Sequence, residues 1–200
     1  MKGRWVAALQ YGCLVVGALL VSVVALARWD AEAGREAALA AFASPAATPD
    51  QALWSPERVE GYAQSVALVT EPPVAILRVP DLGLEVPVYV GASELHLNRG
   101  AGLIEGMGLP DKGGNIGIAG HRDGFFRVLK DIQPGQRIEV ETRARTHRYR
   151  VVSTEIVDPT NLSVLADTLE PTVTLVTCFP FYFIGSAPQR FIVRGAYEWT

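Results

Sequence analysis

From Pro73 to the C-terminus, the sequence is dominated by short β-branched runs separated by turn signals. Asp81-Leu82-Gly83 and Pro134-Gly135-Gln136 are typical turns, and little helical periodicity lies between the runs. Short strands with few intervening helices predict an all-β domain, either an antiparallel sandwich or a small barrel. The runs that we interpret as strands are 74–79, 84–90, 115–119, 137–141, 147–157, 173–178 and 191–197.

Short helices are predicted around this domain. Ser55-Pro56-Glu57 has the composition of a helix start, with a serine N-cap, a proline at the first helical position and an early acid. Apolar residues at 59, 62, 66 and 69 would form one stripe that packs on the domain. Residues 125–130 and 162–166 are expected to form single helical turns.

The run from Trp5 to Ala27 carries no charge, and about 20 apolar residues span a bilayer. Lys2 and Arg4 precede it, so the positive-inside rule predicts a cytoplasmic N-terminus (1–4), a single transmembrane anchor (5–27) in the plasma membrane, and an extracytoplasmic remainder. A cleaved signal peptide is the alternative because Ala25-Leu26-Ala27 is an A-x-A site, but signal cores are usually about 7–15 residues long. Residues 28–72 are interpreted as a spacer with the short helix, and 73–200 as the folded domain.

The chain contains two cysteines. Cys13 lies inside the apolar run and Cys178 near the C-terminus, so an intramolecular disulfide is not expected. Cys178 is then a lone thiol in an exported domain, which suggests a catalytic nucleophile if a basic group lowers its pKa. A formal net charge of −3 gives no indication of nucleic acid binding. The sequence contains neither an EF-hand-like loop nor a Cys/His metal pattern, so no metal and no cofactor is expected.

Three histidines are candidates for the partner of this thiol. His121 follows a predicted strand and a glycine, which would direct its imidazole towards a rim. His96 resembles a surface-turn residue. His147 lies among arginines at 143, 145, 148 and 150, where we expect a solvated strand face. The residues alone favour His121 without selecting it.

The arginine is harder to choose from the pattern alone, but strand geometry offers Arg190 as a neighbour of the thiol. If 173–178 and 191–197 are antiparallel neighbours, Cys178 ends one strand and Arg190 begins the other. A permanently charged guanidinium there would stabilise an oxyanion. A surface arginine on an edge strand is equally compatible with the spacing.

Thr174-Leu175-Val176-Thr177-Cys178 resembles the TLxTC signature of the sortase family. Gly120-His121 resembles that family's histidine segment, and 187–194 (APQRFIVR) resembles its arginine strand, in the same order along the chain. The segments HRDGFFR and CFPFYF are most similar to those of class D sortases. One position departs from the pattern: many relatives have an additional histidine where this chain has Leu103.

The resemblance implies an eight-stranded closed β-barrel and a cysteine transpeptidase. Cys178 would attack the threonine carbonyl of an LPxT-like sorting signal, and His121 would act as general acid and base. Arg190 would stabilise the oxyanion, with Thr177 nearby. The resemblance also implies a substrate pocket lined by 158–171 and 179–188. The partners would be surface proteins that carry the signal, and an amine acceptor from the cell wall or from another protein.

Two other classes compete with this interpretation. An L,D-transpeptidase or a papain-like protease would share only a cysteine and a histidine, and their characteristic segments are absent from the sequence. An inactive module that docks sorting peptides would be favoured if Cys178, His121 or Arg190 were missing, and all three are present.

Overall fold

The computed structural model describes residues 17, 21–22, 49–68, 71–182 and 185–199. The chain divides into two compact units, Met1–Ser44 and Pro45–Thr200. The architecture described below is that of the second unit. The predicted N-terminus (1–4), and the predicted anchor (5–27) apart from residues 17, 21 and 22, lie outside the described residues, as do residues 28–48 of the predicted spacer. Within the described ranges, no helix is long and apolar enough to cross a membrane.

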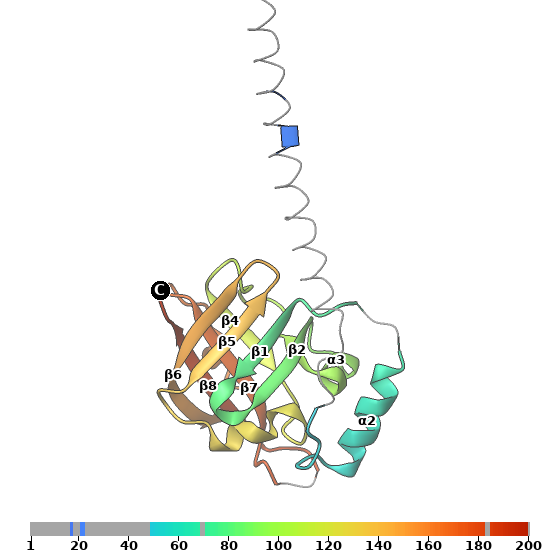
Figure 1. The fold of residues 1–200 in the computed structure, drawn as a ribbon. Helices are drawn as coiled ribbons and strands as arrows, with labels where there is room; N and C mark the ends of the chain where they lie inside the picture. Colours follow the sequence, from blue (N-terminus) through green and yellow to red (C-terminus); the bar gives the residue numbers. More distant parts are fainter. Residues whose placement is uncertain (1–16, 18–20, 23–48, 69–70, 183–184, 200) are drawn as a thin grey trace, which may run out of the picture. The chain divides into compact units, whose positions relative to one another are not determined.

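The second unit is a closed β-barrel (Figure 1), in the order β1-β2-β3-β4-β7-β8-β6-β5. Closure leaves no sheet edge open to another chain. The barrel alternative of the sequence interpretation is therefore confirmed, but the pairing is not antiparallel throughout, because β2 pairs with β3 and β4 with β7 in parallel. The strands are β1 (Ala75–Val79), β2 (Leu84–Val90), β3 (Ala101–Leu103), β4 (Asn115–Ala119), β5 (Arg137–Thr142), β6 (Thr146–Val157), β7 (Thr172–Phe179) and β8 (Gln189–Tyr197).

Apolar side chains of the strands fill the barrel interior, and in β1 they alternate with more exposed residues. In β1, Ala75, Leu77 and Val79 are fully buried while the residues between them are partly exposed. Tyr149 of β6 and Phe126 are among the largest fully buried side chains. Since each fully buried apolar side chain contributes about 1.5–3 kcal/mol, this interior holds the strands, and thus the residues at their ends, in fixed positions.

The sequence interpretation missed β3. This strand has only three residues, and its central Gly102 gives no β-branched signal. A Cβ at Gly102 would lie 2.4 Å from the Gly91 carbonyl oxygen, so close approach of the backbones requires glycine there. Leu103, where we noted a departure from the sortase pattern, is a buried core residue.

The predicted short helices are confirmed. They are the α-helix α2 (Pro56–Val66), capped by Ser55 as expected, and the 3-10 helices η2 (Phe125–Asp131) and η3 (Leu162–Leu165). Trp54 and Tyr62 attach α2 to the core through Phe125, with ring centroids 4.7 and 6.0 Å from that ring. The predicted apolar stripe is only partly correct, because Val66 is 48% exposed. Its last predicted member, Val69, lies outside the described residues. The 3-10 helix η1 (Pro80–Leu82) occupies a predicted turn.

The structure corrects our interpretation of two histidines. His96 lies in the α-helix α3 (Glu94–Arg99) rather than in a surface turn, and α3 contacts α2 beside the barrel (Figure 1). His147 was expected to be solvated, but it is only 2% exposed, and its Nε2 lies 2.9 Å from Asp111 Oδ1. The reason is strand alternation: Arg148 and Arg150 point outward, so His147, directly before Arg148, points inward, as Tyr149 does.

Candidate active site

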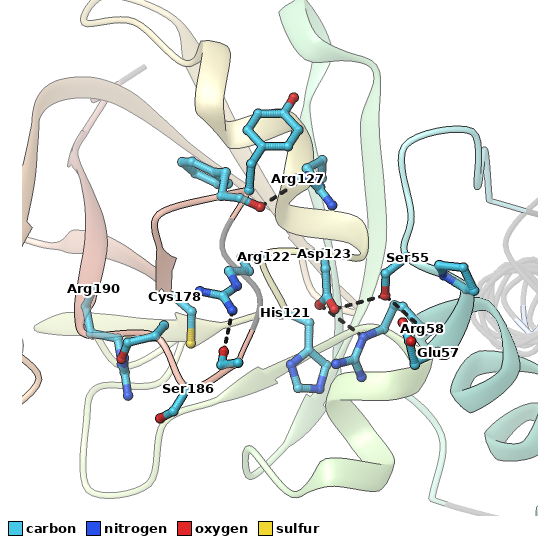
Figure 2. Close-up of a pocket in the computed structure, with 15 residues that line it drawn as sticks. Ser55, Glu57, Arg58, His121, Arg122, Asp123, Arg127, Cys178, Ser186 and Arg190 are labelled. Carbon is cyan, nitrogen blue, oxygen red and sulfur yellow. Dashed lines mark hydrogen bonds and ion pairs between the residues drawn. The ribbon is translucent and has the colours of Figure 1, made fainter.

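Cys178 and Arg190 are cross-strand partners. β7 and β8 pair antiparallel, and the register places Cys178 directly opposite Arg190, as the sequence spacing predicted. Both residues line one cleft of about 840 Å³, shown in Figure 2. The guanidinium of Arg190 donates to the backbone carbonyl of Gln189 at 3.0 Å and to that of Ala187 at 3.4 Å.

His121 lines the same cleft. It follows β4, which runs parallel to β7, so the ends of both strands lie at the same side of the barrel. Two hydrogen bonds hold the segments together at this point: the Gly120 amide donates to the Val176 carbonyl at 3.1 Å, and the Thr177 hydroxyl donates to the Gly120 carbonyl at 2.8 Å. The three predicted residues thus meet in one cleft.

Glycine is required directly before His121. A Cβ at Gly120 would lie 2.6 to 2.8 Å from three carbons of the Phe126 ring, and Phe126 is fully buried. Because such distances are not tolerated, the segment can pass Phe126 only with glycine at position 120. The Gly-His pair of the sequence therefore has a packing reason.

Thr177 does not face the same side as Cys178. Adjacent residues of a strand point to opposite faces, and Thr177 is 3% exposed with its hydroxyl committed to Gly120. The expectation that Thr177 assists at the oxyanion is therefore not supported. Its observed contact instead links the nucleophile strand to the histidine segment.

His121 is held in a charged environment. Its Nε2 lies 3.3 Å from Glu94 Oε1, within ion-pair distance but without hydrogen-bond geometry. Burial first, and the Arg58 guanidinium second, lower the pKa of His121 below its usual value, while Glu94 and Asp123 act in the opposite direction. The imidazolium is therefore the less populated form at neutral pH.

The sequence model of the family described as "Sortase domain" matches residues 77–198. The chain belongs to the sortase family. Members of this family are cysteine transpeptidases, and a closed barrel with Cys178, His121 and Arg190 around one cleft agrees with that membership.

Curated sortases resemble the chain over part of their length. Sortase D of Bacillus subtilis (strain 168) is 32% identical over 121 residues, which make up 60% of this chain and 61% of that protein. Sortase SrtE1 of Streptomyces coelicolor is 34% identical in an alignment 142 residues long that covers 60% of this chain and 39% of that protein. The chain thus spans less than two thirds of the length of each of these relatives.

A solved sortase structure extends the likeness to three dimensions. Sortase C1 of GBS Pilus Island 1, from group B Streptococcus, superposes with a TM-score of 0.61 at 30% identity. The superposition covers 84% of this chain and 83% of that chain. The sortase fold of the second unit is therefore supported by both sequence and structure.

Two arginines that the sequence interpretation did not single out shape one wall of the cleft. Arg122 donates to the carbonyls of Pro180 at 3.1 Å and Gly185 at 2.8 Å, and the buried Arg127 donates to that of Phe181 at 3.1 Å. Arg127 also lies 4.7 Å from the centre of the Tyr182 ring. Arg122 and Arg127 of the HRDGFFR segment thus hold residues of the connection between β7 and β8.

Only one of the two segments expected to line a substrate pocket contributes to this cleft. Residues from 181–182 and 185–187 line it, whereas no residue of 158–171 does so among the described residues. In place of 158–171, another part of the chain lines the cleft: Ser55, Pro56, Glu57 and Arg58 at the start of α2. No motif in the sequence indicated this contribution. Within the described part of the chain, no cluster of three metal-ligating side chains occurs.

Proposed function

We propose that the chain is a membrane-anchored sortase that cleaves an LPxT-like C-terminal sorting signal and transfers the protein to an amine of the cell envelope. The observation that carries this proposal is the meeting of a free thiol, an imidazole and a guanidinium in one cleft at the same end of β4, β7 and β8. The uncharged run 5–27 supports the anchor.

In the first half-reaction, the Cys178 thiolate attacks the threonine carbonyl carbon of the signal. A C–S bond forms, and the carbonyl oxygen becomes an oxyanion that the guanidinium of Arg190 stabilises. The C–N bond then breaks, and the departing amine takes its proton from the His121 imidazolium. The products are a thioester on Cys178, a neutral His121 and the released C-terminal fragment.

In the second half-reaction, an amine attacks the thioester carbonyl. His121 accepts the proton that the amine loses, the C–S bond breaks, and a new amide forms with the thiolate regenerated. Water in place of the amine gives hydrolysis by the same steps. Two acceptors fit this chemistry: an amine of a cell-wall peptide, or a lysine of another protein.

The guanidinium of Arg190 already donates hydrogen bonds within the protein, which affects how it can stabilise the oxyanion of the first step. Its donors contact Ala187 and Gln189 carbonyls of its own loop, so stabilising an oxyanion requires a remaining N–H of the fork or a small rotation of the side chain. Arginine has five donors in a planar fork, which is enough to retain the loop contact and to serve the substrate.

Product analysis tests this proposal. The purified full-length chain is incubated with a panel of LPxT-like peptides, each with and without an amine acceptor, and the products are separated by liquid chromatography and identified by mass. We expect cleavage after threonine for at least one motif, and a ligated product only when the acceptor is present. Cys178→Ala is the control. Cleavage by that variant, or the absence of cleavage by the unaltered chain with every motif, would contradict the proposal.

A further inference from the structure

Arg58 of α2 connects three separate parts of the site. Its Nε donates to Asp123 Oδ1 at 3.2 Å, its Nη1 lies 3.4 Å from Glu94 Oε1, and the same Nη1 donates to Asn98 Oδ1. The side chain is only 16% exposed. One guanidinium therefore joins α2, α3 and the loop that carries His121, and it lies outside the residues that match the family, 77–198.

Glu94 lies between this guanidinium and the imidazole. The same carboxylate oxygen, Oε1, is 3.4 Å from Arg58 Nη1 and 3.3 Å from His121 Nε2. Nε2 is buried and has no hydrogen-bond partner among the described residues, so the carboxylate acts on the ring through its charge. In Figure 2 the Arg58 guanidinium lies beside the His121 ring.

Asp123 is the second carboxylate that Arg58 contacts. Besides Arg58, it accepts a hydrogen bond from the Ser55 hydroxyl at 3.1 Å on its other oxygen, and its backbone carbonyl accepts from the Ser55 amide at 3.2 Å. The stem of Arg58 packs against Gly124, where a Cβ would lie 3.1 Å from Arg58 Cγ. Burial alone would raise the pKa of Asp123, but Arg58 and the Ser55 hydroxyl hold it below its ordinary value.

We propose that Arg58 is a positioning residue for His121: by bridging Asp123 and Glu94, it fixes the imidazole in the cleft and makes α2 part of the catalytic unit. This inference rests on the role proposed above for His121. The bidentate fork of arginine suits the task, because it reaches two carboxylates in fixed directions, whereas lysine is a single point charge.

The charges around His121 determine what loss of Arg58 does. Arg58 from α2, Glu94 from α3 and Asp123 from its own loop act on the imidazole, and Arg122, Cys178 and Arg190 line the same cleft. Removing the guanidinium leaves Glu94 and Asp123 without their shared cation, so both carboxylates favour the imidazolium. The pKa of His121 should then rise.

A histidine titration of the full-length chain tests the inference without substrate. Samples labelled with carbon-13 at histidine Cε1 are followed by NMR across the pH range, and the His121 signal is assigned by its loss in His121→Gln. We expect the pKa of His121 to rise in Arg58→Gln and to stay near that of the unaltered chain in Arg58→Lys. Arg99→Gln is the matched control, because Arg99 binds the Ser65 and Leu68 carbonyls and so attaches α2 at its other end, away from His121.

Turnover supplies the second readout. In Arg58→Gln and in Arg58→Lys, kcat for peptide cleavage should fall by roughly tenfold to a hundredfold, with KM changed much less, because a misplaced imidazole impairs the chemical step. Unaltered His121 pKa values together with unaltered kcat in both Arg58 variants would overturn the inference. So would an equal pKa shift in Arg99→Gln. Failure of the unaltered chain to cleave any peptide contradicts the proposed function instead, and leaves the titration result standing.

Discussion

Thr177→Val tests whether the link between the nucleophile strand and the histidine segment holds the site together. The change keeps β-branching and nearly the same volume, but it removes the hydroxyl that donates to the Gly120 carbonyl at 2.8 Å. Thr177 and Gly120 are both buried, so water does not readily replace the lost donor. The perturbation is thus confined to one hydrogen bond.

The expected cost follows from that burial. Leaving a buried carbonyl unpaired costs about 1–3 kcal/mol, and each kcal/mol lowers the Tm of a chain of 150–250 residues by about 2–4 °C. A loss of about 2 kcal/mol therefore predicts a Tm lower by about 4–8 °C. Because the segment that loses its tether carries His121, peptide cleavage should also fall by about tenfold or more.

Thermal unfolding followed by circular dichroism, together with peptide cleavage, measures both effects. Thr177→Ser is the matched control, since it keeps the hydroxyl and loses one methyl group, at about 0.8 kcal/mol. It should retain most of the activity. A Thr177→Val protein as stable and as active as the unaltered chain, or a serine variant equally impaired in both assays, would refute the reasoning.

Three further outcomes are expected. Gly120→Ala should destabilise the protein by about 1–3 kcal/mol, measured by urea denaturation, because its Cβ would overlap the Phe126 ring; unchanged stability would contradict the packing argument. Tyr149→Phe should be neutral or stabilising by up to about 1 kcal/mol, since the buried Tyr149 hydroxyl has no hydrogen-bond partner among the described residues; a clear loss of stability would indicate a contact we have not identified. The pKa of His121 is below the value of 6.5 that it has when unfolded, so the unfolded chain binds more protons as the pH falls through this region, and stability decreases. His121→Gln should reduce the loss of stability that begins as the pH falls below about 7, and an identical loss in the variant would count against the assignment.

Residue types along the sequence predicted most strands of the barrel. β-branched runs bounded by Gly and Pro identified all strands except β3, and the Ser-Pro-Glu start predicted α2 with its cap. β3 was missed because it is stabilised by pairing on both sides, and propensity does not register pairing. The parallel pairings of β2 with β3 and of β4 with β7 also depend on connections that sequence periodicity does not reveal.

The part of the site that lies on two adjacent strands could be predicted from the sequence. Cys178 lies near the end of β7 and Arg190 near the start of β8, so their pairing followed from strand geometry and spacing. His121 required the family resemblance, because the residues alone also allowed His96 and His147. The alternation that buries His147 was present in the sequence, but the surrounding arginines led us to expect a solvated strand face.

The contribution of α2 was not predictable from the sequence. Arg58 and Asp123 are separated by 65 positions, and neither belongs to a recognisable motif with the other. Their contact arises only because Trp54 and Tyr62 dock α2 against Phe125, which follows the histidine loop. Tertiary packing of this kind leaves no periodic trace in the chain.

The central claim is that Cys178 is the nucleophile of a transpeptidase whose other catalytic residues are His121 and Arg190. Intact-mass spectrometry of the full-length chain, quenched with acid shortly after mixing with a cleaved peptide, tests it most directly. We predict an added mass equal to the acyl portion of the peptide, located on Cys178 by digestion, that disappears on addition of an amine acceptor as ligated product forms. Accumulation of this adduct should be strongly slowed in His121→Ala and Arg190→Ala. Peptide cleavage without any adduct on Cys178, or an adduct that forms equally fast in both variants, would contradict the account.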